Sequence, residues 1–169
     1  MKTTSVFKSL SCLDRLVFVS EENCSPVNIV LLYESELTRE WARDIHDHVL
    51  RLAAGNGVRP TWWRLNNLSE PGVLAAAAST AMRADVIVVA ARTTEGLPLP
   101  FYVWVNSWLN HRRQHGGVLV GMLGAPKPRS AKSGRVSDYL RGIAGVARMG
   151  FLLDKREYRA DEPLAAEAA

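Results

Sequence analysis

The chain has 169 residues, a length that suits one domain with a single hydrophobic core. Hydrophobic residues make up 47% of it and charged residues 22%, which argues against a disordered chain. The formal net charge of +4 is spread along the sequence, so we expect a solvated basic surface and no specific nucleic-acid partner. No stretch approaches the roughly 18 apolar residues of a membrane span, and the N-terminus lacks the apolar core of a signal peptide. We therefore expect a soluble, cytoplasmic protein.

The cysteines and histidines do not form a metal-binding pattern. Both cysteines, Cys12 and Cys24, precede the first strand that the sequence predicts, and no CxxC or Cys/His spacing is present. A disulfide between them is the minority alternative in a cytoplasmic protein. None of the four histidines belongs to an HExxH motif. We predict free thiols and no metal site.

The first half of the chain predicts two strands and two helices. The branched apolar run 27–33 is typical of a buried strand. A second strand is expected at 59–65, where Pro60 favours a position at the sheet edge. Ser69 is expected to cap the second helix, which contains an alanine run. The first helix, over 37–54, has an apolar face at three- or four-residue spacing, formed by Leu37, Trp41, Ile45, Val49 and Leu52.

The second half predicts three more strands and two more helices. The strand at 85–91 is the most continuously apolar, as a central parallel strand should be. Pro100 suits the first position of a helix that we expect to run to about His115. The remaining elements are a strand at 117–123, a helix at 136–146 and a strand at 147–153.

Strands and helices alternate with short connections, which predicts a parallel sheet with right-handed crossovers and helices on both faces. Five strands fit a three-layer α/β/α flavodoxin-like fold with strand order 2-1-3-4-5. The domain would span 27–153, between an N-terminal extension (1–26) and a C-terminal tail (154–169). In such a sheet the ligand crevice lies at the carboxyl ends of strands one and three. That placement brings 34–39 beside 92–100.

The loop after the first strand holds the candidate phosphate ligands. Ser35 and Thr38 offer hydroxyls beside the free amides of a helix N-terminus, and Arg39 adds a positive charge. Against this, Glu34 and Glu36 would repel an anion, and the two hydroxyls could instead cap the helix. Both interpretations stay open from the residues alone.

Three short motifs mark the third strand and the helix after it. Ala84-Asp85 begins the strand, Leu99-Pro100 opens the helix, and Trp108-Leu109 lies near the helix end. Together they resemble the third-strand segment of the NADPH-dependent FMN reductase family, which runs Ala-Asp, strand, Thr-Pro-Glu-Tyr-Asn, Ile-Pro and a helix ending Asp-Trp-Leu. The resemblance extends more loosely over 27–153, including Gly124-Ala125-Pro126.

The resemblance implies an FMN-binding, NAD(P)H-dependent oxidoreductase that takes a flavin and a nicotinamide nucleotide and forms a homodimer. This chain lacks the family's stacking tyrosine and asparagine, so ring contacts would go through backbone groups of 93–96. The dimer contact would use the helix face that carries Trp104 and Trp108. No catalytic residue is assigned. The cofactor-binding candidates are Ser35, Thr38, Arg39, Arg92, Thr93, Thr94, Glu95, Gly96 and Gly124.

One other function class competes with the reductase. The reductase hypothesis includes a degenerate relative that kept the pocket, and its alternative is a non-catalytic protein-interaction or regulatory module, similar to a pseudo-receiver domain. A phosphorylatable receiver needs an aspartate at the end of strand three, where this chain has Ala90-Ala91-Arg92. A hydrolase is disfavoured because no GxSxG elbow is present. The basic stretch 127–135 could meet the phosphates of a nicotinamide cofactor or an acidic partner, or form a solvated loop.

Overall fold

The computed structural model describes residues 25–53, 56–92, 96–112, 116–126 and 134–158. The strands are β1 (Val27–Tyr33), β2 (Val58–Arg64), β3 (Val86–Ala91), β4 (Val118–Pro126) and β5 (Gly150–Tyr158). The helices are α2 (Glu36–Ala53), α3 (Pro71–Met82), α4 (Leu99–Trp108) and α5 (Arg135–Ala147), with short 3₁₀ helices η2 (Leu65–Ser69) and η3 (Leu109–His111).

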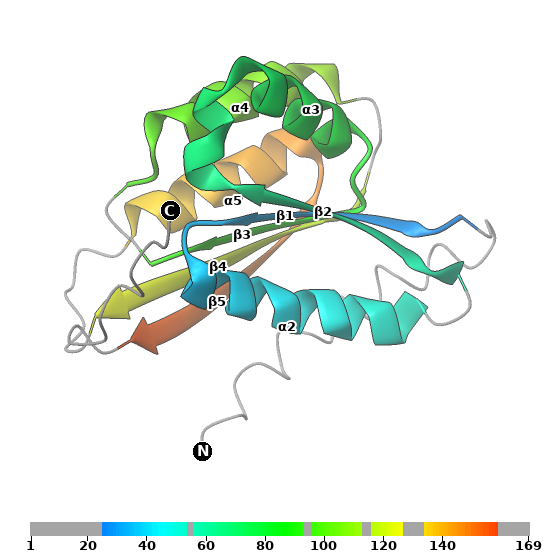
Figure 1. Ribbon diagram of the computed structural model, residues 1–169, viewed down its shortest axis with the longest axis horizontal. Coiled ribbons are helices and arrows are strands. Elements are labelled where there is room, and N and C mark those ends of the chain that lie inside the picture. The colour runs from blue at the N-terminus through cyan, green and yellow to red at the C-terminus, as the bar shows by residue number, and fades with distance from the viewer. Residues whose placement is uncertain (1–24, 54–55, 93–95, 113–115, 127–133, 159–169) are drawn as a thin grey trace.

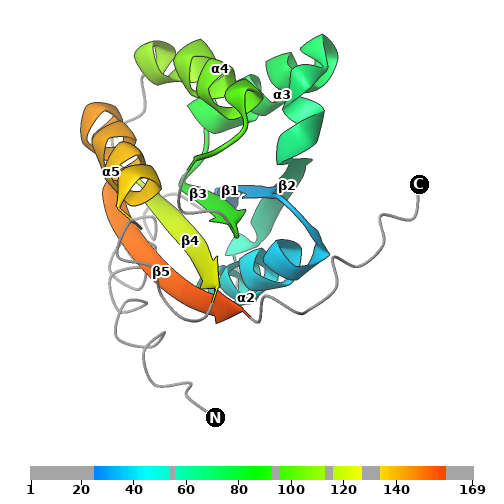
Figure 2. The same ribbon diagram turned by 90° about the vertical axis from the view of Figure 1, so that its left-hand side faces the viewer.

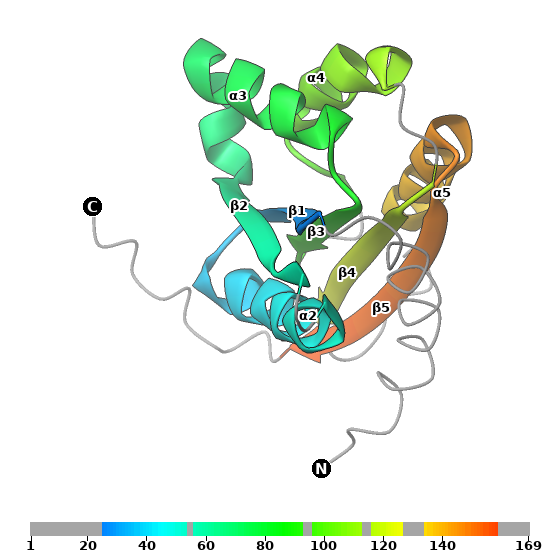
Figure 3. The same cartoon turned by 90° about the vertical axis from the view of Figure 1, so that its right-hand side faces the viewer.

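The strands pair in parallel, in the order β2-β1-β3-β4-β5, which confirms the predicted order (Figure 1). Helix α2 lies on one face of the sheet, and α3, α4 and α5 lie on the other (Figures 1 and 2). Figure 3, seen from the side opposite to that of Figure 2, shows the same placement of α2 on one face and the other three labelled helices on the other. Among the described residues this is the three-layer α/β/α arrangement expected from the alternation of strands and helices. Pro60 lies in β2, at the sheet edge, as predicted.

The core divides into two clusters because neighbouring strand residues point to opposite faces. β3 is buried along its whole length, since helices cover both of its faces. On one face, Trp41, Ile45 and Val49 of α2 pack against alternate residues of the central strands. On the other face, the helices α3, α4 and α5 enclose a larger cluster. The helix periodicity therefore predicted the inward face of α2 correctly.

Trp104 and Trp108 belong to the second cluster, with exposed fractions of 1% and 0%. Their rings pack against each other, with centroids 5.4 Å apart. Because both are enclosed by their own chain, they do not offer the dimer contact expected from the sequence. The outward face of α4 carries Leu99 and Val103 instead.

The start of α3 and the end of α4 differ from the prediction. Ser69 does not cap α3; it ends η2, where its hydroxyl donates to the Asn66 carbonyl, and α3 begins after Glu70 without a side-chain cap. α4 ends at Trp108 and continues only as η3, so it stops short of His115. Arg112 then leaves the helical path in an extended conformation, which brings its guanidinium to backbone carbonyls at the end of α3.

β5 begins and ends later than expected. Ala147, expected to open this strand, is instead the last residue of α5, which ends where Arg148 adopts a left-handed conformation (φ 56°). The strand then runs to Tyr158, five residues past the expected end at Leu153, and pairs with β4 along its length. Its second half is charged, and β5 is an edge strand, so apolar patterning did not reveal it.

Candidate functional site

The carboxyl ends of β1 and β3 lie side by side, as the fold requires. Tyr33 pairs with Ala90, so the residues that follow each strand emerge at the same edge of the sheet. Only Glu34 and Ser35 separate β1 from α2. The loop that should cradle a phosphate is therefore very short.

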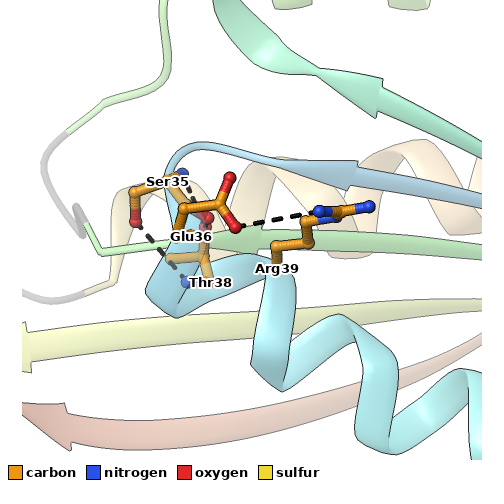
Figure 4. Close-up of polar contacts among 4 residues, drawn as sticks. All are labelled: Ser35, Glu36, Thr38 and Arg39. Carbon is orange, nitrogen blue, oxygen red and sulfur yellow. Dashed lines mark hydrogen bonds and ion pairs between the residues drawn. The ribbon is translucent and has the colours of Figure 1, made fainter. Parts of the chain in front are cut away.

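The hydroxyl of Thr38 closes this loop from inside (Figure 4). Its oxygen accepts hydrogen bonds from the amides of Glu34 and Ser35, each at 2.9 Å, and its proton is donated to the Ser35 carbonyl at 3.0 Å. A threonine hydroxyl has one proton to donate and two lone pairs to accept with. All of this capacity is used within the loop, and the Thr38 residue is fully buried.

Two further amides at the helix start, those of Thr38 and Arg39, are also directed at Ser35. The Thr38 amide points to the Ser35 hydroxyl oxygen at 3.5 Å, and the Arg39 amide donates to the Ser35 carbonyl at 2.9 Å. A phosphate at a helix N-terminus depends on free amides that point at it. The hydroxyls of this loop thus act as helix caps, one of the two alternatives left open by the sequence.

Glu34 bridges the two strands of the crevice. Its Oε2 accepts a hydrogen bond from the Arg92 amide at 2.7 Å, across 58 residues of sequence. Hydrogen bonds to a carboxylate are short and about twice as strong as those between neutral groups. A negative side chain of the protein therefore takes the first amide after β3, and it would repel a phosphate brought to the same place.

Arg39 turns away from the crevice. Its guanidinium lies 5.6 Å from the ring centroids of both Tyr33 and Trp62, and 3.7 Å from the carboxylate of Glu36. Trp62 belongs to β2, so Arg39 lies over the β1–β2 side of the sheet rather than between β1 and β3. The cationic ligand expected for a phosphate is engaged with aromatic rings instead.

Gly124 is buried beneath two aromatic side chains. A Cβ at this position would lie 2.5 Å from Cη2 of Trp41 and 3.2 Å from Cδ1 of Tyr158. The guanidinium of Arg92 lies over the Tyr158 ring, 5.7 Å from its centroid. Glycine is therefore required here for close packing of the chain's own aromatic rings, a role the sequence could not distinguish from ligand contact.

The remaining cofactor-binding candidates lie in the segment between β3 and α4. Gly96 lies in the loop before α4, and a Cβ there would meet no heavy atom within 4 Å. Thr93, Thr94 and Glu95 lie outside the described residues, as does most of the basic stretch 127–135. Within the described ranges there is no group of three or more metal-ligating side chains. Nor does any described helix combine the length and apolarity needed to cross a membrane.

FMN is the cofactor that the fold and the resemblance imply, and the described residues do not fit its phosphate. The Thr38 hydroxyl is saturated, the Arg92 amide is taken by a carboxylate, and Arg39 points elsewhere. Sequence reasoning recognised that Glu34 would repel an anion but missed its bond to the Arg92 amide. No sequence signal reports that contact, because it depends on the pairing of β1 with β3.

Comparison with solved structures supports the fold. A short-chain flavodoxin associated with a non-canonical PDU bacterial microcompartment aligns with a TM-score of 0.58 and 17% identity, covering 79% of this chain and 85% of its own. A flavodoxin of Streptococcus pneumoniae TIGR4 gives 0.56 and 16%, covering 79% and 87%. An oxidoreductase from Corynebacterium diphtheriae gives 0.53 and 16%, covering 76% and 79%.

No family model matches the chain, and no curated protein matches it in sequence. The FMN reductase family therefore stays a prediction. At such low identities the likeness to solved structures shows the fold alone. The chain has a flavodoxin-like fold, with its strand order and its layers in common with flavodoxins and an oxidoreductase.

Proposed function

We propose that this flavodoxin-like domain is a degenerate relative of the FMN-dependent oxidoreductases, one that acts as a binding module and lacks the FMN phosphate site. The observation that carries the proposal is the saturated Thr38 hydroxyl, which takes both amides of the β1–α2 loop. A phosphate that used the amides of Glu34 and Ser35 would have to displace bonds that the loop makes with itself. The nearby Glu34 carboxylate adds repulsion to that cost.

A phosphate bound here would exchange hydrogen bonds that the amides already make for new ones. A helix N-terminus attracts a phosphate because it has unpaired amides and a partial positive charge. Here, the amides of Glu34 and Ser35 already have a neutral acceptor, and the Arg92 amide has an anionic one. Replacing these partners with a phosphate would form few additional hydrogen bonds. The gain that normally holds FMN at this position is therefore small.

A second candidate is the FMN-binding, NAD(P)H-dependent oxidoreductase implied by the sequence resemblance. It is favoured by the fold that the chain has in common with two flavodoxins and an oxidoreductase. In that function, residues 93–96 would contact the flavin ring through backbone groups. The nicotinamide nucleotide and the homodimer belong to this candidate alone.

Titration of FMN and riboflavin with the purified protein, followed by flavin fluorescence, distinguishes the two candidates. We expect a colourless protein and no saturable quenching of either flavin at micromolar protein. A yellow protein, or FMN bound at least about tenfold more tightly than riboflavin, would overturn the loss of the phosphate site. Equal binding of both flavins would overturn the binding-module proposal while leaving the phosphate argument intact.

Two variants refine the experiment. If the protein does bind flavin, Arg39→Ala should change the affinities for FMN and riboflavin equally, because Arg39 faces Tyr33 and Trp62. A selective loss of FMN binding would mean that Arg39 does reach the phosphate. Glu34→Gln is the matched variant inside the crevice: it keeps an oxygen acceptor for the Arg92 amide and removes the negative charge.

A further inference from the structure

A pocket of about 290 Å³ lies at the opposite end of the sheet from the crevice at the carboxyl ends of β1 and β3. It is formed where the amino-terminal parts of β1 and β2 meet the last turn of α3. This volume is at the lower end for a small-molecule site, so it suits a ligand of few heavy atoms. Its lining residues are Asn28, Ile29, Val30, Arg59, Thr61, Thr80 and Arg83.

The register of the sheet explains why polar groups gather here. Asn28 pairs with Arg59, and Val30 pairs with Thr61, so these side chains point to the same face of the sheet. Val30 belongs to the cluster under α3, α4 and α5, which identifies that face as the α3 side. The last turn of α3 then brings Thr80 and the exposed Arg83 to the same pocket.

The two arginines of the pocket are not neutralised. Arg83 makes only a long contact, 3.5 Å, with the Ser79 hydroxyl. In the described ranges, neither Arg59 nor Arg83 forms an ion pair with a carboxylate. Among the residues that the structure describes, no acidic residue lines the pocket. The described part of the lining therefore carries two positive charges and no negative one.

The hydrogen-bond acceptors near the pocket, two backbone carbonyls and one carboxylate, have partners other than Arg59 and Arg83. The carbonyls of Ala81 and Ala84, at the end of α3, each accept a hydrogen bond of 2.8 Å from the guanidinium of Arg112. The Asp85 carboxylate accepts from the Asn28 amide at 2.9 Å, and its charge interacts with that of Arg112. Arg112 thus balances both the helix terminus and Asp85. Arg59 and Arg83 remain as an excess of two positive charges.

We propose that this pocket binds a small phosphate ester, with Arg59 and Arg83 holding the phosphate from two sides. A phosphate dianion offers enough oxygens for two guanidinium groups, which bind it through paired hydrogen bonds. The Thr61 hydroxyl adds a further donor, because its present contact with the Ile29 carbonyl is long, at 3.5 Å. The space beyond the phosphate holds the organic part. The site is independent of the flavin crevice and does not rest on the function proposed above.

The proposal is tested by titrating the full chain with glycerol 3-phosphate at low, constant ionic strength. Binding is followed through the amide chemical shifts of the protein. We expect saturable shifts centred on Asn28, Thr61 and Thr80, with a dissociation constant of about 1 mM or tighter. Arg59→Gln and Arg83→Gln should each weaken binding at least about fivefold. Arg43→Gln, an exposed arginine on the other side of the sheet, is the matched control and should leave binding unchanged.

Other outcomes would contradict the proposal. No saturation by about 10 mM glycerol 3-phosphate would overturn the site, as would shifts centred elsewhere or equal losses in the Arg43→Gln control. Equal binding of succinate, which carries the same charge on two carboxylates, would overturn the assignment to a phosphate. Arg59 and Arg83 are exposed, so replacing them should leave the core intact. The thermal unfolding of Arg59→Gln and Arg83→Gln, measured in parallel, should match that of the unchanged protein. The flavin titration is unaffected by any of these results.

Discussion

Replacing Thr38 by valine tests the closed loop directly, because valine has nearly the same shape and no hydroxyl. In the structure this hydroxyl accepts from two amides at 2.9 Å and donates to a carbonyl at 3.0 Å. A donor left without a partner in the protein interior costs about 1–3 kcal/mol. Both amides are only partly buried, so water compensates some of the loss. We expect Thr38→Val to lower the free energy of unfolding by about 2–4 kcal/mol.

Urea and thermal unfolding measure this effect. For a domain of this size, 1 kcal/mol corresponds to about 2–4 °C in Tm, so we expect a decrease of about 5–15 °C. Thr80→Val is the matched control: that hydroxyl donates one bond to the Ala77 carbonyl within α3, and its loss should cost about 0.5 kcal/mol or less. Thr38→Ser keeps the hydroxyl and should cost only about 1 kcal/mol for the lost methyl group. If Thr38→Val is no more destabilising than Thr80→Val, the loop is not held as described.

Three further changes probe the surrounding structure. Gly124→Ala places a Cβ 2.5 Å from the buried Trp41 ring, so it should destabilise the fold by about 1–3 kcal/mol in urea unfolding; an unchanged midpoint would mean that the ring moves aside freely. Arg112→Lys keeps the charge but cannot reach the three carbonyls that the guanidinium contacts, so we expect a loss of about 2 kcal/mol, and a neutral result would show that the contacts do not matter. Burial, and then the neighbouring Tyr102, raise the pKa of Tyr139 above its ordinary value of 10.0. The folded state therefore keeps this proton to higher pH than the unfolded state does. The contribution of Tyr139 to the free energy of unfolding is fully present below pH 10 and is lost as the pH rises through the raised pKa. Tyr139→Phe should flatten that alkaline decline in unfolding midpoints, and a decline as steep as in the unchanged protein would contradict the assignment.

Much of the fold was predictable because its signals are local. The apolar run 27–33 matched β1 at both ends, and the helix periodicity identified the buried face of α2. A strand covered on both faces needs continuous apolar residues, and β3 has them. The boundaries that were missed, at α4 and β5, depend on distant partners. Arg112 ends the helical path at carbonyls about thirty residues away, and the charged half of β5 is ordered by its pairing with β4.

In the candidate site, too, some features follow from the local sequence and others depend on contacts between distant residues. By itself, the sequence determined which residues follow β1 and β3, and thus that Glu34, Thr38 and Arg92 meet at one edge of the sheet. The tertiary structure decided what they do there. A hydroxyl at the start of a helix can hold a ligand or cap the helix, and the choice depends on which amides lie within about 3 Å of it. Here those amides belong to the protein's own loop, and a carboxylate takes the amide of Arg92.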